Sequence, residues 1–287
     1  MRWRRELRIV AYLLAIGSIP ARAQGDVRPL NPVRLTLESL LRTRGPDWVR
    51  HESPHFWIFA ERPIREGELA RVADSLESAW RHAESLLEQP IDDQPRATVL
   101  LTRSRTRFAG VVPVQGKGLW TRLPADGDVI LLVRNDSVRA HTRHEVMHLV
   151  AFRAWGSQRG EWWLTEGLAT FADGTCQHTT IAVVGRDLMR ARPTLTATEL
   201  QHRFTELWRA DRAMAYVLAG TLVDYLWTTR GREGVRRLWQ GSDSLDEQSV
   251  LPGAGGELTR GWRAHVERTA AQTPGLDSAR FRRLGCG

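Results

Sequence analysis

The chain has 287 residues, of which 42% are apolar and 26% are charged, the balance of a folded globular protein with a buried core. Its formal net charge is +8, but residues 1–23 supply +4 of this charge with five arginines and one glutamate. The other basic residues stand singly among acidic ones and form no cluster, so the charge pattern argues against a nucleic-acid partner.

Residues 1–23 have the pattern of a signal peptide. Four arginines precede a short apolar run, Ile9–Ile19, and Ala21-Arg22-Ala23 matches a small-x-small cleavage site. The run is about 11 residues long, whereas a membrane-spanning helix needs about 20, so we expect no stable membrane span after this segment is removed. The predicted location is therefore exported, either periplasmic or extracellular, in a bacterium.

The chain after the signal peptide begins with strand and helix patterns. Residues 24–50 contain several prolines and no clear period, and we interpret them as an N-terminal arm. An amphipathic helix is predicted for Glu66–Glu88, where apolar residues recur every three to four positions. Strands are predicted at 55–60, 96–102 and 128–133, and the three glycines and one proline of Gly110–Thr121 indicate turns or a bent strand.

Helical patterns dominate from residue 138 onward. Helices are predicted over Val138–Trp155, Trp163–Asp173, Ala213–Arg230, Gly231–Trp239 and Leu258–Arg268. This order of elements predicts an α+β fold with one domain, 51–272. Within that domain a small strand-and-helix lobe, 51–135, packs on a mostly helical lobe, 136–272, and residues 273–287 form a C-terminal tail.

The segment His144-Glu145-Val146-Met147-His148 carries the clearest chemical signal. Histidines four residues apart lie one above the other on a single helix face, so both imidazoles can reach one ion. Glu145 projects from a neighbouring angle and can contact a water on that ion without being a ligand. This is the H-E-x-x-H pattern of zinc hydrolases. A cation also offsets the cost of burying a carboxylate in these apolar surroundings.

Glu166 is the predicted third ligand. It stands 18 positions after His148 in an apolar, helix-compatible segment and would complete a set of two nitrogens and one oxygen, with a fourth position left for water. The ion makes that water acidic near neutral pH, and Glu145 is placed to accept its proton. His178 is the alternative third ligand, but the surrounding segment, 176–180, has turn-type rather than helical character.

These segments resemble the gluzincin metallopeptidases, and most closely the bacterial peptidase MA-like domain group. The resemblance is concentrated in His144–His148 and in Trp163-Leu164-Thr165-Glu166-Gly167, and it continues through Tyr216–Gly220 and Gly231–Gly234. It implies a thermolysin-like catalytic core, one zinc ion per chain and a peptide or protein substrate. The extended metzincin motif is absent, because residues 151 and 154 are both alanine.

The same resemblance implies roles for further residues. In the family the strand before the first zinc helix lies at a sheet edge and pairs with extended substrate, and Asp128–Val133 is the matching segment. The family's oxyanion donor comes from a later helix, for which Tyr216 is the candidate and Tyr225 the competitor. Thermolysin-type enzymes have an aspartate four residues after the glutamate ligand. Thr170 stands there in this chain, which leaves Asp173 as the candidate for orienting a zinc histidine.

The sequence therefore predicts an exported zinc metallopeptidase with Glu145 as its general base. No glycine-x-methionine-glutamate-asparagine strand is present, which favours an endopeptidase over an aminopeptidase. The alternative is a non-catalytic, zinc-containing protein of the same fold that binds peptides or envelope components, and the intact Glu145 argues against it. Cys176 and Cys286 could pair in an exported protein, and the sequence leaves this pairing open.

Overall fold

The computed structural model describes residues 48–103, 118–123, 127–133, 142–176, 179–245 and 255–272. The predicted signal peptide, most of the predicted arm, the C-terminal tail, His178 and Cys286 lie outside these residues, so the predictions made for them stay predictions. Among the described helices, none combines the length and the apolar composition that a bilayer-spanning segment requires.

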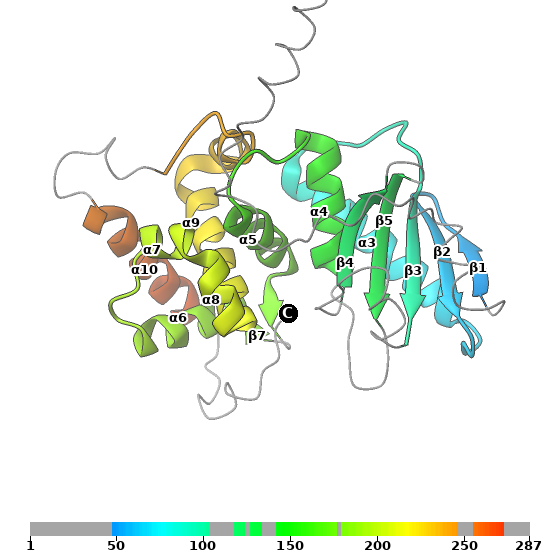
Figure 1. Ribbon diagram of the computed structural model, residues 1–287, viewed down its shortest axis with the longest axis horizontal. Coiled ribbons are helices and arrows are strands. Elements are labelled where there is room, and N and C mark those ends of the chain that lie inside the picture. The colour runs from blue at the N-terminus through cyan, green and yellow to red at the C-terminus, as the bar shows by residue number, and fades with distance from the viewer. Residues whose placement is uncertain are drawn as a thin grey trace, which may run out of the picture. The chain divides into compact units, whose positions relative to one another are not determined.

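The described residues form a mixed α/β structure, with a five-stranded sheet in the N-terminal part and helices through most of the remainder (Figure 1). This agrees with the predicted fold class at the level of strand and helix content. In chain order the elements are β1 (Trp48–Glu52), β2 (Phe56–Glu61), α3 (Glu68–Leu87), β3 (Ala97–Thr102), β4 (Gly118–Leu123), β5 (Gly127–Val133), α4 (Thr142–Trp155), α5 (Trp162–Asp173), β6 (Thr175–Cys176), β7 (Thr179–Thr180), α6 (Ile181–Ala191), α7 (Ala197–His202), α8 (Phe204–Ala210), α9 (Arg212–Trp239) and α10 (Gly255–Ala271).

The large sheet has the strand order β1-β2-β3-β5-β4. Strands β2, β3 and β5 run parallel to one another, and β1 and β4 are antiparallel to their single neighbours among the described strands. Every residue of β3 is buried, as expected for a central parallel strand covered on both faces. The helix α3 connects β2 to β3, which is the crossover that a parallel pair requires.

The prediction that 128–133 is the edge strand is wrong. This segment forms β5, which lies between β3 and β4, and among the described strands β4 holds the edge position beside it. The glycines of Gly110–Thr121 indicate turns or a bent strand; within this segment the described residues from Gly118 onward form the strand β4, and Leu119 to Thr121 suit an extended backbone. The last three residues of the predicted arm, 48–50, instead belong to the strand β1.

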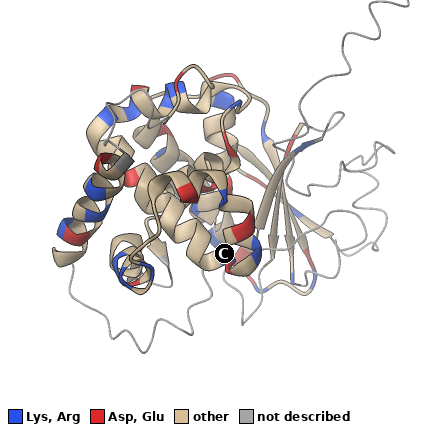
Figure 2. Cartoon of the chain, turned by 60° about the vertical axis from the view of Figure 1, so that its left-hand side comes forward, with Lys and Arg blue, Asp and Glu red and all other residues tan. Residues whose placement is uncertain are grey.

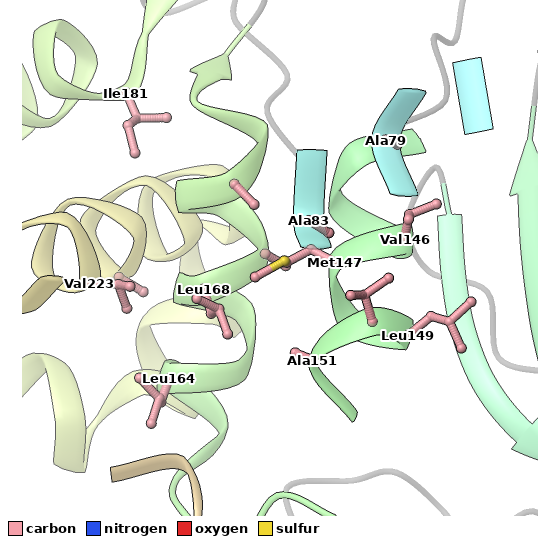
Figure 3. Close-up of a cluster of buried hydrophobic side chains, with 14 of the residues drawn as sticks. Ala79, Ala83, Val146, Met147, Leu149, Ala151, Leu164, Leu168, Ile181 and Val223 are labelled. Carbon is pink, nitrogen blue, oxygen red and sulfur yellow. The ribbon is translucent and has the colours of Figure 1, made fainter. Parts of the chain in front are cut away.

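Two helices, α3 and α4, lie side by side against the same sheet. The helix α3 contacts β1 and β2, whereas α4 contacts β4 and β5, and the two helices pack on each other. Met147 then projects from α4 towards α5, where Leu168 lies, while Val146 and Leu149 lie on the sheet side of α4 (Figure 3). Because α4 is buried on both sides, it joins the sheet to the helices that follow.

The helices α5 and α9 approach each other closely at Gly167. A β-carbon at this position would lie 2.8 Å from the carbonyl oxygen of Ala219 and 2.9 Å from a methyl carbon of Val223. Only a residue without a side chain allows this approach. The predicted boundary between two later helices, at residues 230 and 231, appears as a kink within α9, where Gly231 has a φ of 68°.

Acidic and basic residues are intermixed along the described helices (Figure 2). Several of them form surface ion pairs between neighbouring elements, for example Arg190 with Glu267 at 2.9 Å. Such exposed pairs contribute little to stability, because solvent screens them. Of the buried ionisable side chains in the described part of the chain, three lie on α4: His144, Glu145 and His148.

Candidate metal centre

Three predicted ligands meet between α4 and α5. The Nε2 atom of His144 lies 3.2 Å from Oε2 of Glu166, and Nε2 of His148 lies 3.6 Å from the same oxygen. The two imidazole Nε2 atoms are 3.2 Å apart. The exposed fractions of the three side chains are 10% for His144, 9% for His148 and 13% for Glu166. The structure therefore brings these three residues together in a nearly buried cluster.

The spacing of these atoms fits one small cation. Ligands about 2.1 Å from a tetrahedral zinc ion lie about 3.4 Å from one another, which is the range seen between these three side chains. Two imidazole nitrogens and a carboxylate oxygen are also the donor types of a catalytic zinc site with an open position. Among the described residues, this is the group of histidine, cysteine and acidic side chains whose donor atoms could hold a metal ion.

The helices fix these side chains through their own spacing. His144 and His148 are four residues apart on α4, so they share one face of that helix. Their rings are nearly perpendicular, with centroids 4.8 Å apart, so that both Nε2 atoms point at the same place. Glu166 reaches that place from the second turn of α5, which packs directly on α4.

Glu145 is buried beside the cluster but is not part of it. The pKa of Glu145 is raised to about 7; burial is the largest cause, and the negative charges of Glu166 and Asp173 act in the same direction. The charge of His144 and a hydrogen bond from the main-chain N–H of Trp120 act in the opposite direction. Glu145 is thus held between α4 and β4, next to the ligands.

Gly118 makes room for Glu145. A β-carbon at residue 118 would lie 2.5 Å from Oε1 of Glu145 and 2.6 Å from its Cγ atom. The carboxylate therefore packs directly on the main chain of β4, and any larger residue at 118 would displace it. Sequence analysis missed this contact, because nothing in the local pattern shows which strand lies over the second residue of the motif.

Glu166 has a second hydrogen-bond partner, Trp162, which sequence analysis also missed. The indole Nε1 of Trp162 donates to Oε1 of Glu166 at 3.0 Å, while Oε2 of Glu166 faces the two histidines. The positive charge of His148 and hydrogen bonds from the two histidines hold the pKa of Glu166 below its usual value despite its burial. The helical spacing of four residues between Trp162 and Glu166 was the signal that could have revealed the pair.

Trp162→Phe is expected to weaken metal binding by about 10- to 100-fold, because residues that orient a metal ligand have effects of this size. Phenylalanine keeps the aromatic contacts of the ring with Phe204 and Trp208, at 5.2 and 5.0 Å, but has no N–H for Glu166. Zinc affinity measured by competition with a chromophoric chelator tests this. Trp208→Phe, which changes the same aromatic cluster without removing a donor to Glu166, is the control. Equal losses in both variants would contradict the proposed role of the indole.

Of the two candidate tyrosines, only Tyr216 packs against a predicted metal ligand in the described part of the chain. Tyr216 lies on α9 with its ring 5.6 Å from the ring of His144. Burial, followed by the negative charge of Glu166, raises the pKa of Tyr216 well above its usual value, so the hydroxyl stays protonated and can donate a hydrogen bond. Tyr225 instead packs beside His265 of α10, with ring centroids 5.8 Å apart.

Thr170 and Asp173 occupy different surroundings. The side chain of Thr170 packs against Gly220 of α9, and its buried hydroxyl has no hydrogen-bond partner in the described part of the chain. Thr170 therefore serves the contact between α5 and α9, which a charged residue could not do without a partner. The negative charge of Asp173 contributes to the raised pKa of Glu145. Its predicted role in orienting a zinc histidine stays a prediction.

Comparison with known proteins adds little to this description. No protein-family model matches the chain, and no curated protein matches it either. Among solved structures, the chain is similar to an aminopeptidase N family protein from Idiomarina loihiensis, with a TM-score of 0.38 and 13% sequence identity. The match covers 82% of this chain and 45% of that protein, so the chain spans less than half of its length.

Proposed function

We propose that this protein is an exported, zinc-dependent metallopeptidase that hydrolyses peptide bonds with Glu145 as the general base. The observation that carries the proposal is the convergence of His144, His148 and Glu166, with a separate buried carboxylate beside them. A purely structural metal site has no use for such a carboxylate. The proposed zinc content is one ion per chain.

The ligand set determines what the ion contributes. Zinc held by His144, His148 and Glu166 supplies positive charge that acidifies water and stabilises negative charge on a carbonyl oxygen. The side chains of the protein then move the protons. Glu145 accepts one proton from the attacking water while the water oxygen bonds to the carbonyl carbon of the substrate. When the carbon–nitrogen bond breaks, Glu145 delivers that proton to the leaving nitrogen.

The electrostatic surroundings of Glu145 suit both halves of this cycle. Its pKa of about 7, which results mainly from burial, lies close to neutral pH. A group that takes up and then releases a proton works best when its pKa is near the working pH. This value applies to the chain without an ion; a cation on the neighbouring ligands would lower the pKa, so that Glu145 is ionised before it accepts a proton from the attacking water.

Tyr216 is the proposed oxyanion donor. Negative charge develops on the carbonyl oxygen during attack, and a hydrogen-bond donor placed beside that oxygen lowers the barrier. The ring of Tyr216 lies near His144, and its raised pKa keeps the hydroxyl proton in place at neutral pH. Tyr225 is less suitable, because its ring packs on α10.

The edge strand β4 is the proposed binding surface for the substrate backbone. The main-chain N–H of Trp120 points at Glu145 and not at β5, so the outer edge of β4 lies along the site. An extended peptide can pair with such an edge through main-chain hydrogen bonds, which depend little on its side chains. This arrangement suits cleavage within a chain, and we therefore favour an endopeptidase.

Hydrolysis of a quenched fluorescent peptide library tests the proposal. Purified protein loaded with zinc is expected to cleave some of the peptides, chelator-treated protein is expected to cleave none, and added zinc is expected to restore activity. Metal analysis of the same samples is expected to give one zinc per chain. Zinc binding without cleavage of any peptide would reject the enzymatic proposal and favour a non-catalytic binding protein of the same fold.

A further inference from the structure

Arg122 lies on the proposed substrate strand, two residues beyond Trp120. The main-chain groups of alternate residues in a strand point in the same direction, so those of Arg122 face outward like those of Trp120. The side chains of both residues also lie on the α4 side of the sheet. The Trp120 ring is 5.2 Å from the Phe152 ring, and the guanidinium carbon of Arg122 is 4.5 Å from the centre of the same ring.

Among the described residues, the charges in contact with Arg122 do not cancel. Asp128 accepts hydrogen bonds from Nε and Nη2 of Arg122 at 2.9 and 3.0 Å, and it also accepts one from Nε of Arg153 at 2.9 Å. Two guanidinium groups thus share one carboxylate, which leaves this triad with a net charge of +1. The side chains of Asp128 and Arg153 are 1% and 4% exposed, whereas that of Arg122 is 47% exposed. Arg122 is therefore the one member of this triad whose charged group is accessible to a ligand.

The position of Arg122 is also fixed in advance of binding. Two hydrogen bonds to a buried aspartate and the ring of Phe152 hold the guanidinium in one place. A cation that is already ordered loses little conformational entropy when it meets an anion. It is therefore suited to discriminate between ligands, and not only to keep the surface soluble.

We propose that Arg122 selects peptides that carry a carboxylate about two residues from the bond that is cleaved. This proposal rests on the peptidase function and on pairing of the substrate with β4. Residues opposite each other in paired strands have their side chains on the same face, and opposite charges there attract. A substrate residue opposite Arg122 therefore meets its guanidinium. The carboxylate comes either from an Asp or Glu side chain or from the C-terminus of a short peptide.

Matched peptides measure this preference. One series has Glu or Gln at the second and third residues on either side of the cleaved bond, and a second series has a free or an amidated C-terminus. We expect kcat/KM to be about two- to fivefold higher for the carboxylate form at one of these places. Arg122→Gln is expected to abolish the difference while still cleaving the neutral peptides. The fold should tolerate this change, because Asp128 keeps its ion pair with Arg153.

Arg50→Gln is the matched control. Arg50 is an exposed arginine on β1, the strand at the other end of the sheet, and its guanidinium carbon lies 3.9 Å from the centre of the Trp57 ring. The control variant is expected to keep the preference. Equal cleavage of the two forms by the unchanged protein, or a preference that survives Arg122→Gln, would overturn the proposal and leave the peptidase function intact.

If the zinc-loaded protein cleaves no peptide, the proposed function fails first. Fluorescence polarisation of the same peptides, labelled and added to the zinc-loaded protein, then decides the role of Arg122. Binding that is tighter for the carboxylate form and loses this difference in Arg122→Gln would support the carboxylate contact. Binding without such a difference, or no binding, would reject it.

Discussion

Glu145→Gln is expected to lower peptide hydrolysis by about 10²- to 10⁴-fold, the usual contribution of a general base, while zinc stays bound. Glutamine has nearly the same shape as glutamate and fits the space beside Gly118, but it cannot accept a proton from water. Turnover of a cleaved library peptide and metal analysis of the same sample provide the measurement. Equal turnover in the two proteins would remove Glu145 from the mechanism.

The stability of the metal-free variant is the control for this experiment. The pKa of Glu145 is raised from 4.5 to about 7 by folding, mainly through burial. Between these values the folded chain keeps a proton that the unfolded chain has released, so this group lowers stability as pH rises towards 7. The free energy of unfolding of Glu145→Gln, relative to that of the unchanged protein, should therefore be about 3 kcal/mol higher at pH 8 than at acidic pH. Urea unfolding with a chelator present measures the difference.

His148→Ala is expected to abolish both hydrolysis and stabilisation by zinc. A ligand that binds only the folded state stabilises it by about 4 kcal/mol when present at about 1,000 times its dissociation constant. The unchanged protein should show this gain on addition of zinc, whereas the variant should show almost none. Thermal unfolding with zinc and with a chelator gives the comparison.

His82→Ala is the matched control for the ligand substitution. The Nε2 atom of His82 lies 3.0 Å from the carbonyl oxygen of Ala172, so this histidine links α3 to α5 away from the ligand atoms. The control is expected to lower stability in both conditions by the same amount and to keep the gain from zinc. An unchanged zinc gain in His148→Ala would show that the ion binds elsewhere.

The ligands could be predicted from sequence because their geometry is mostly local. Two histidines four residues apart on one helix share a face, and their apolar neighbours indicated that the helix is buried. Glu166 lies on the next helix, which packs directly on α4, so the prediction crossed only one connection. Tyr216 came from a more distant helix and depended on the resemblance to a known family, and the structure brings its ring beside that of His144.

The sheet edge could not be predicted in the same way. Strand order depends on which distant segments pair, and no local pattern shows that β4 follows β5 in space although it precedes it in the chain. The contacts of Gly118 and Trp120 with Glu145 depend on this order, so they were also missed. From sequence, Thr170 is notable only because thermolysin-type enzymes have an aspartate at its position. In the structure it packs against Gly220 of α9.

The close approach of α9 to Gly167 has a consequence for when the protein acquires its ion. All three ligands precede residue 170. Gly167, the residue next to Glu166, packs against α9, a helix that begins more than 40 positions later, at Arg212. A growing chain that has produced every ligand therefore lacks the support that orders them. We expect zinc to bind after α9 has packed on α5, so zinc binding stabilises a fold that has already formed and does not start folding.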